Sequence, residues 1–261
     1  MSFDILQIDL SKLNSMTKYP SILTYHLLGE KGVLQDTVQI PFAGRVVGSE
    51  KVDGTNCRLI FCPDKSALVG SREDLLWERR DLVGNPAMGI VDAVRQVVRT
   101  QFPKLWDENS IKVYYLEVYG KSIGAAAKNY TKDGKVGFRL FDVVSIENYD
   151  ELFSLPAEKI AHWRDNGGQK FVHADQLCQL ASDAGFTPVP PLFDFDASSL
   201  PRELDATYEF LMSQGLTKCK LDDAAEGIPE GIVVRAADRS SIAKIRREDY
   251  ERTIKRAKVK G

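Results

Sequence analysis

Residues 50–56 read Glu50-Lys51-Val52-Asp53-Gly54-Thr55-Asn56 and lie between two apolar segments, 45–52 and 56–62. Both segments contain β-branched or aromatic residues at close spacing, and we expect both to be strands. A lysine in this place is held on a rigid sheet and is not left free on the surface. Taken alone, the Lys-x-Asp-Gly pattern is weak. The alternative is a β-turn in which Gly54 supplies a positive φ and Lys51 is solvated.

Further strings follow in a fixed order along the chain. They are Ser71-Arg72, Glu117-Val118-Tyr119-Gly120, Phe138-Arg139-Leu140-Phe141-Asp142, Glu230-Gly231-Ile232-Val233-Val234-Arg235 and Lys244-Ile245-Arg246. With them the sequence resembles the covalent nucleotidyltransferase superfamily of polynucleotide ligases and mRNA-capping enzymes. Because Asn56 follows the Lys-x-Asp-Gly-Thr pattern, it is most similar to the RNA ligase 2 family, the phage-type enzymes that seal nicks in duplex RNA. The resemblance spans about residues 36–247.

The resemblance implies the α+β fold of a ligase adenylation domain, with largely antiparallel sheets flanked by helices. The apolar pattern agrees, because strands outnumber helices and do not alternate with them regularly. We predict strands at 36–41, 45–52, 56–62, 112–119, 138–146, 231–235 and 242–246, and helices at 88–102, 172–184, 199–214 and 249–258. We interpret residues 189–196 as a Pro-containing connection and the acidic stretch 192–230 as a surface insertion. The whole chain, 1–261, is predicted to be one nucleotidyltransferase domain.

The chemistry implied by the resemblance begins at the lysine. Its amine attacks the α-phosphorus of ATP, which gives lysyl-AMP and releases pyrophosphate. The AMP then passes to a 5′-phosphate end, and a 3′-hydroxyl displaces it to close the strand. An ordinary lysine has a pKa near 10.4 and is less than ~1% neutral at pH 7, so nearby positive charge must favour its neutral form. Arg72, Lys244 and Arg246 supply such charge in this sequence, and a metal ion would add to it.

The resemblance also assigns roles residue by residue. Lys51 would be the nucleophile, Glu50 would help to read the adenine edge, and Asn56 would assist at the ligation step. Arg72 and Glu117 would hold the ribose, which suits a guanidinium fork and an acceptor carboxylate. Phe138 would stack on the purine with Phe141 as a core residue behind it, although the two assignments could be reversed. Glu230 would hold Mg²⁺ or Mn²⁺ directly or through water. Lys244 and Arg246 would contact the α-phosphate, although the family usually has lysine in place of Arg246.

Composition and charge exclude several classes of protein. The chain is 43% hydrophobic and 28% charged, and no apolar run is long enough to cross a bilayer, so we expect no membrane partner. Four cysteines in 261 residues do not make a disulfide framework, so we expect a reducing, intracellular compartment, with the cytoplasm as the predicted location. No Gly-rich phosphate loop is present, and the three histidines are too scattered for a metal site.

The net charge of −2 conceals an uneven distribution, because residues 239–261 carry nine basic against three acidic side chains. We expect a basic C-terminal helix at about 249–260. Only 15 residues follow Arg246, too few for the OB-fold domain of DNA ligases and capping enzymes. We hypothesise that the basic segment partly replaces the missing RNA clamp, through Lys255, Arg256, Lys258 and Lys260.

The sequence therefore predicts an ATP-dependent RNA ligase that uses Mg²⁺ or Mn²⁺ and joins RNA ends bearing a 3′-OH and a 5′-phosphate. Three alternatives remain open. One is an enzyme that adenylylates itself or RNA 5′ ends and needs an accessory protein for sealing. The second is a GTP-dependent, capping-type guanylyltransferase. The third is a non-catalytic protein that binds nucleic-acid ends.

Overall fold

The strands form two larger antiparallel sheets and one small one. The computed structural model describes residues 3–78, 89–121, 123 and 126–260, and within them the sheets have five, four and two strands. The five-stranded sheet has the order β6-β5-β4-β7-β8, made of Leu75–Glu78, Ala67–Ser71, Thr55–Phe61, Ile111–Gly120 and Val136–Ile146. The four-stranded sheet has the order β11-β10-β3-β9, made of Ile242–Arg246, Gly231–Ala236, Arg45–Lys51 and Pro191–Asp196. The small sheet pairs β1 (His26–Leu28) with β2 (Leu34–Val38).

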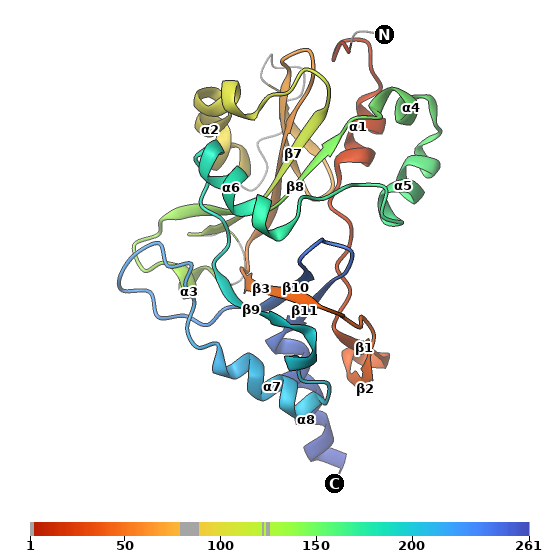
Figure 1. Ribbon diagram of the computed structural model, residues 1–261. Helices are drawn as coiled ribbons and strands as arrows, with labels where there is room; N and C mark the ends of the chain where they lie inside the picture. The colour runs from red at the N-terminus through yellow and green to blue at the C-terminus, as the bar shows by residue number, and fades with distance from the viewer. Residues whose placement is uncertain (1–2, 79–88, 122, 124–125, 261) are drawn as a thin grey trace.

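Helices cover both faces of the five-stranded sheet (Figure 1). On one face, α2 (Ile90–Leu105) and α6 (Ala174–Ala184) pack on an apolar core that includes Leu59 and Leu116. On the other face, a second core joins the sheet to α1 (Leu10–Thr17), α4 (Tyr149–Ser154) and α5 (Ala157–Asp165). This second core occupies only part of its face. The remainder of that face, around Asn56 and Glu117, turns toward the four-stranded sheet.

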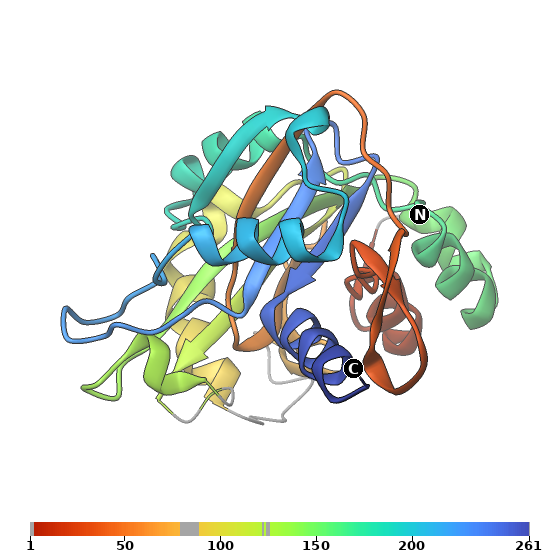
Figure 2. The same cartoon turned by 90° about the horizontal axis from the view of Figure 1, so that it is seen from below.

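The four-stranded sheet carries its helices on the side away from the five-stranded sheet. Figure 2 shows α7 (Leu204–Ser213) crossing its strands, with α8 (Arg247–Lys260) beside it. Leu211 of α7 and Tyr250 of α8 share a buried core with Ile232 and Ile245 of the sheet. Short helical segments at η1 (Glu30–Gly32), α3 (Ala127–Tyr130) and η3 (Ala197–Ser199) lie in the connections. In the part of the chain that the structure describes, no helix is long and apolar enough to span a membrane.

The predicted α+β architecture is confirmed, and most of the predicted elements are present. The strand predicted at 36–41 is wrong in its second half, because β2 ends at Val38 and Gln39 turns back to bond the carbonyl of Tyr25. The connection and insertion predicted from 189 onward are wrong at 191–196. That segment is β9, which pairs with β3 in antiparallel register. In α2, Val91, Val94 and Val98 are buried as expected, whereas the side chain of Phe102 lies outside the described residues.

A β-bulge in β8 changes which of its side chains face each side of the sheet. Leu140 is opposite Leu116 of β7 while Asp142 is opposite Tyr115, so Phe141 is an extra residue in the ladder. Such an insertion interrupts the alternation of side chains along a strand. Leu140 before the bulge and Val143 after it therefore both pack in the core beneath α2 and α6, although they are three positions apart, while Phe141 faces the opposite side.

Candidate active site

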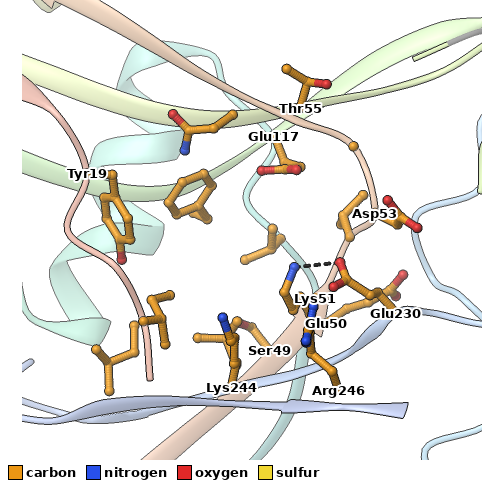
Figure 3. Close-up of a pocket in the computed structure, with 18 of the residues that line it drawn as sticks. Tyr19, Ser49, Glu50, Lys51, Asp53, Thr55, Glu117, Glu230, Lys244 and Arg246 are labelled. Atoms are coloured by element: carbon orange, nitrogen blue, oxygen red, sulfur yellow. Dashed lines mark hydrogen bonds and ion pairs between the residues drawn. The ribbon is translucent and has the colours of Figure 1, made fainter. Parts of the chain in front are cut away.

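One cavity of about 480 Å³ lies between the two larger sheets. Its lining comes from strands of both sheets and from the segment that follows α1. The lining residues include Tyr19, Ile22, Lys51, Asp53, Asn56, Arg72, Glu117, Phe141, Glu230, Val233, Arg235, Ile242, Lys244 and Arg246. Charged side chains gather around Lys51 at one end, and Tyr19 lies at the other (Figure 3). A cavity of this size, with charged groups converging at one end and aromatic and aliphatic side chains elsewhere, can hold a small polar molecule.

Lys51 and Glu230 form an ion pair inside the cavity. The Lys51 ammonium donates to Glu230 Oε2 over 2.5 Å, and both side chains are about one fifth exposed (23% and 22%). Sheet register produces this contact, because Lys51 at the end of β3 is opposite Gly231 at the start of β10. Gly231 is required there, since a Cβ would lie 2.0 Å from the carbonyl oxygen of Ile245. In the Glu230-Gly231 pair, the glycine therefore lets β10 pack closely on β11, and the preceding glutamate places its carboxylate beside Lys51.

Gly54 allows the five-stranded sheet to pack close to Lys51. A Cβ on Gly54 would lie 2.3 Å from the carbonyl oxygen of Val118, so the turn after Lys51 packs directly on β7. Its φ is not positive, so close approach and not turn geometry explains the glycine of the Lys-x-Asp-Gly pattern. The result is that Glu117 of β7 faces the cavity near Lys51.

Burial raises the pKa of Glu117 to about 7. The negative charges of Glu230 and Asp53 add to this effect, while the positive charge of Lys51 opposes it. Asn56 is the strand neighbour of Glu117 and also lines the cavity. Its Oδ1 is buried with no hydrogen-bond partner among the described residues. A buried polar atom of this kind can accept a hydrogen bond from water or from a bound molecule.

Basic side chains line the cavity from β11 and from the residue that follows β5. Lys244 and Arg246 point into it from alternate positions of β11. Burial, followed by the charges of Arg246, Lys51 and Arg72, lowers the pKa of Lys244. No ion pair of the Lys244 ammonium is present among the residues that the structure describes. Arg72 is more exposed and donates to Ser21 Oγ over 3.2 Å. These cations can accept an anionic ligand.

Glu50 also lines the cavity, but its carboxylate is engaged by residues outside it. Because side chains alternate along a strand, Glu50 points to the face of β3 opposite Lys51. Its carboxylate is almost fully buried and accepts hydrogen bonds from the hydroxyl of Thr217 and, at 2.7 Å, from the backbone N–H of Lys218. Burial raises its pKa. The predicted contact with an adenine edge would therefore compete with contacts that hold the loop before Glu230.

Phe138, predicted to stack on a purine, does not line the cavity. It precedes the bulge of β8 and packs on the opposite face of the sheet, edge-on to Phe186. Phe141, predicted as the core residue behind it, lines the cavity instead. Its ring contacts Tyr19 edge to face, with ring centroids 5.0 Å apart. The physical reason is the alternation of side chains along β8, since Phe138 and Phe141 are three positions apart and therefore face opposite sides of the sheet.

The sequence pattern missed several residues that complete the site. The hydroxyl of Tyr19 donates to Asp142 over 2.9 Å and accepts from Arg239 over 2.7 Å. Asp142 is buried and also pairs with Arg235, which lines the cavity. This network joins the five-stranded sheet to the β10–β11 hairpin. Of this network, the motifs quoted from the sequence contained Asp142, directly after Phe141, and Arg235.

A strand-borne lysine that faces carboxylates and cations from two antiparallel sheets is the arrangement of a covalent nucleotidyltransferase. The sequence pattern of the RNA ligase family matches residues 44–260, and the chain belongs to that family. None of the curated proteins compared with the chain matches it. Tyr19 and Ile22 precede the matched region, although both line the cavity.

Solved RNA ligases share the fold. A Naegleria gruberi RNA ligase with PPi superposes with a TM-score of 0.55 at 18% identity, covering 92% of this chain and 59% of that one. A mutant of the Naegleria gruberi RNA ligase with ATP and Mn gives a TM-score of 0.55 at 16% identity, with 91% and 62% covered. An archaeal ATP-dependent RNA ligase gives 0.54 at 15% identity, with 89% and 49% covered. The chain thus spans less than two thirds of the length of these enzymes.

Proposed function

We propose that this protein is an ATP-dependent RNA ligase that joins 3′-OH and 5′-phosphate RNA ends through lysyl-AMP at Lys51. The observation that carries the proposal is the convergence of Lys51, Glu117, Glu230, Lys244 and Arg246 on one cavity. Membership of the RNA ligase family supports the reaction class. The solved relatives with ATP and Mn and with PPi support the choice of nucleotide and metal.

The two ends of the cavity match the two parts of a nucleotide. The aromatic ring of Phe141 and the aliphatic side chains of Val233 and Ile242 suit the flat faces of a purine ring, which stack on aromatic and apolar groups. Lys244 and Arg246 suit phosphates. Phe141 therefore replaces Phe138 in our proposal as the stacking residue. Glu117 and Arg72 remain the proposed contacts of the ribose.

Attack on ATP requires Lys51 to lose a proton. Its Nζ then forms a bond to the α-phosphorus, the bond from that phosphorus to the bridging oxygen breaks, and pyrophosphate leaves with the electron pair. Lys244 and Arg246 would stabilise the charge that develops on the α-phosphate and on the leaving group. In the structure Glu230 accepts a hydrogen bond from Lys51 Nζ, and this contact must break before the nitrogen can attack the phosphorus.

The residues present fit a divalent metal of the magnesium type. No cluster of three or more His, Cys, Asp or Glu side chains that could hold a metal exists among the described residues. Mg²⁺ needs no such cluster, because it is usually held by one or two carboxylates together with water and substrate phosphates. Glu230, with Glu117 nearby, would hold it. When bound, the cation would offset the charge of the phosphates and of Glu230.

The RNA would approach from the side of α8. Lys255 and Arg256 are exposed on this helix, which directly follows the cavity strand β11. Neutralising Lys255, Arg256, Lys258 and Lys260 should weaken the binding of RNA ends and flatten its dependence on salt, since each contact between a cation and a phosphate releases counterions. Unchanged sealing at every salt concentration would contradict this assignment.

A sealing assay separates the proposal from its alternatives. Duplex RNA with a nick bearing 3′-OH and labelled 5′-phosphate is incubated with the protein, ATP and Mg²⁺ or Mn²⁺. We expect a joined strand whose label resists phosphatase. Accumulation of adenylylated 5′ ends without joining would favour an enzyme that needs a partner for sealing. Activity with GTP alone would favour a capping-type enzyme, and binding of ends without any reaction would favour a non-catalytic protein.

A further inference from the structure

Arg246 is held on one edge by a buried carboxylate outside the cavity. Its Nε and Nη2 each donate to Asp249 over 2.8 Å, one to each carboxylate oxygen. Asp249 is fully buried (0% exposed), whereas the side chain of Arg246 is 27% exposed and lines the cavity. Two parallel bonds of this kind fix both the position and the plane of a guanidinium.

The local sequence explains how the pair forms. Arg246 is the last residue of β11 and α8 begins at Arg247, so Asp249 lies in the first helical turn. A carboxylate is favoured there by the free N–H groups of the helix N-terminus. Arg252, one turn later, donates to Asp249 Oδ1 over 3.3 Å and to the carbonyl oxygen of Gly32 over 3.1 Å. Arg252 therefore fixes the carboxylate through Oδ1, the same oxygen that accepts from Arg246 Nη2.

The bonding pattern leaves the other edge of the guanidinium for a ligand. An arginine has five N–H donors, and Asp249 uses two of them. The remaining donors, those of Nη1 and the outer N–H of Nη2, have no partner among the described residues. A lysine ammonium at this position would be a point charge that needs no such orientation.

We propose that Asp249 is a positioning residue that orients Arg246 toward the phosphates of the bound nucleotide. Asp249 does not touch the nucleotide itself. The inference rests on the proposed function, since it concerns the same nucleotide site. It predicts that the charge of Asp249 affects the KM for ATP only when an arginine occupies position 246.

The test is a double-substitution cycle with lysyl-AMP formation measured over a series of ATP concentrations. We expect Asp249→Asn to raise the KM for ATP roughly tenfold, because a hydrogen bond to a charged group typically contributes that much. In the Arg246→Lys background the same substitution should change the KM less than about twofold. Glu248→Gln is the matched control. It removes the adjacent carboxylate, which is 70% exposed and, within the described residues, bonds Arg252 but not Arg246, and it should leave the KM unchanged.

The outcomes distinguish the two claims. If the wild type forms lysyl-AMP and Asp249→Asn has the same KM for ATP, the inference is overturned and the proposed function stands. The inference is also overturned if Asp249→Asn raises the KM for ATP as much in the Arg246→Lys background as in the wild type. No lysyl-AMP from folded wild-type protein overturns the proposed function and the inference with it. If Asp249→Asn does not fold, Asp249→Glu moves the carboxylate by one methylene. This variant should also raise the KM, and a wild-type KM would overturn the inference.

Discussion

The Lys51 ammonium lies 2.5 Å from Glu230 Oε2, although 179 positions separate the two residues along the chain. The pairing of β3 with β10 in one sheet creates this contact. It places the proposed nucleophile against the carboxylate proposed to hold the metal. Under the proposal, binding of the metal by Glu230 and attack by Lys51 would be linked, because each one disrupts the same ion pair.

Substitution of Glu230 tests this link. In Glu230→Gln the amide cannot pair with the ammonium and is a poor ligand for Mg²⁺. We expect lysyl-AMP formation to need about 10–100-fold more metal, the usual effect of altering a metal site. Titration of Mg²⁺ at saturating ATP measures this. Glu226→Gln, an exposed carboxylate on the same loop, is the control. Equal metal requirements in both variants would contradict the assignment of Glu230.

Substitutions of Phe141 and Phe138 in β8 should have different effects, the first on ATP binding and the second on stability. Phe141→Leu should raise the KM for ATP about fivefold or more, because base stacking on an aromatic ring contributes about 1–3 kcal/mol. Phe138→Leu should leave the KM unchanged and lower the free energy of unfolding by about 1 kcal/mol, since Phe138 packs in a core. ATP titrations and denaturant unfolding of both variants provide the measurements. A raised KM in Phe138→Leu alone would restore the sequence prediction.

The raised pKa of Glu117 predicts a dependence of stability on pH. The folded protein holds the proton of this carboxyl up to about pH 7, whereas the unfolded chain releases it near 4.5. The stabilisation is therefore fully present below about pH 4.5 and is lost as the pH rises through 7. The decrease between pH 5 and 8 should be on the order of 2 kcal/mol in metal-free wild type. The same decrease in Glu117→Gln would show that another group causes it.

The buried network beneath Phe141 should carry much of the stability of the site. Asp142 is 1% exposed between Arg235 and Arg239, so Asp142→Asn leaves two buried guanidinium groups without a counter-charge. We expect a loss of about 3–5 kcal/mol in the free energy of unfolding, measured by denaturant titration. Asp238→Asn, on the exposed β10–β11 turn, is the control and should change stability by less than about 0.5 kcal/mol. Similar midpoints for the two variants would contradict this account.

Local patterns predicted the strands around Lys51, Glu117 and Glu230 because each combines an apolar run with a glycine that close packing requires. The bulge at Phe141 could not be predicted in this way. It depends on which residues of β7 and β8 pair, a long-range property that alternation alone does not encode. The acidic composition after residue 192 likewise concealed β9, whose Phe193 and Phe195 pack beneath the sheet while Asp194 and Asp196 alternate outward.

Contacts between distant segments account for the site residues that the sequence did not reveal. Tyr19 reaches the cavity through hydrogen bonds to Asp142 and Arg239, which lie more than 120 positions away. Asp249 could be recognised only once α8 was seen to begin directly after Arg246. In both cases the residue type alone did not indicate a role in the site. The role became visible only from the residues that contact it in the folded structure.

The most direct test of the central claim is covalent labelling at Lys51. The protein is incubated with α-labelled ATP and Mg²⁺ or Mn²⁺, denatured, and mapped by peptide analysis, with Lys51→Ala and labelled GTP as controls. We predict that AMP from ATP labels the peptide containing Lys51 and that the label is absent from Lys51→Ala. Label on another residue, label from GTP alone, or no label on well-folded wild type would contradict the account.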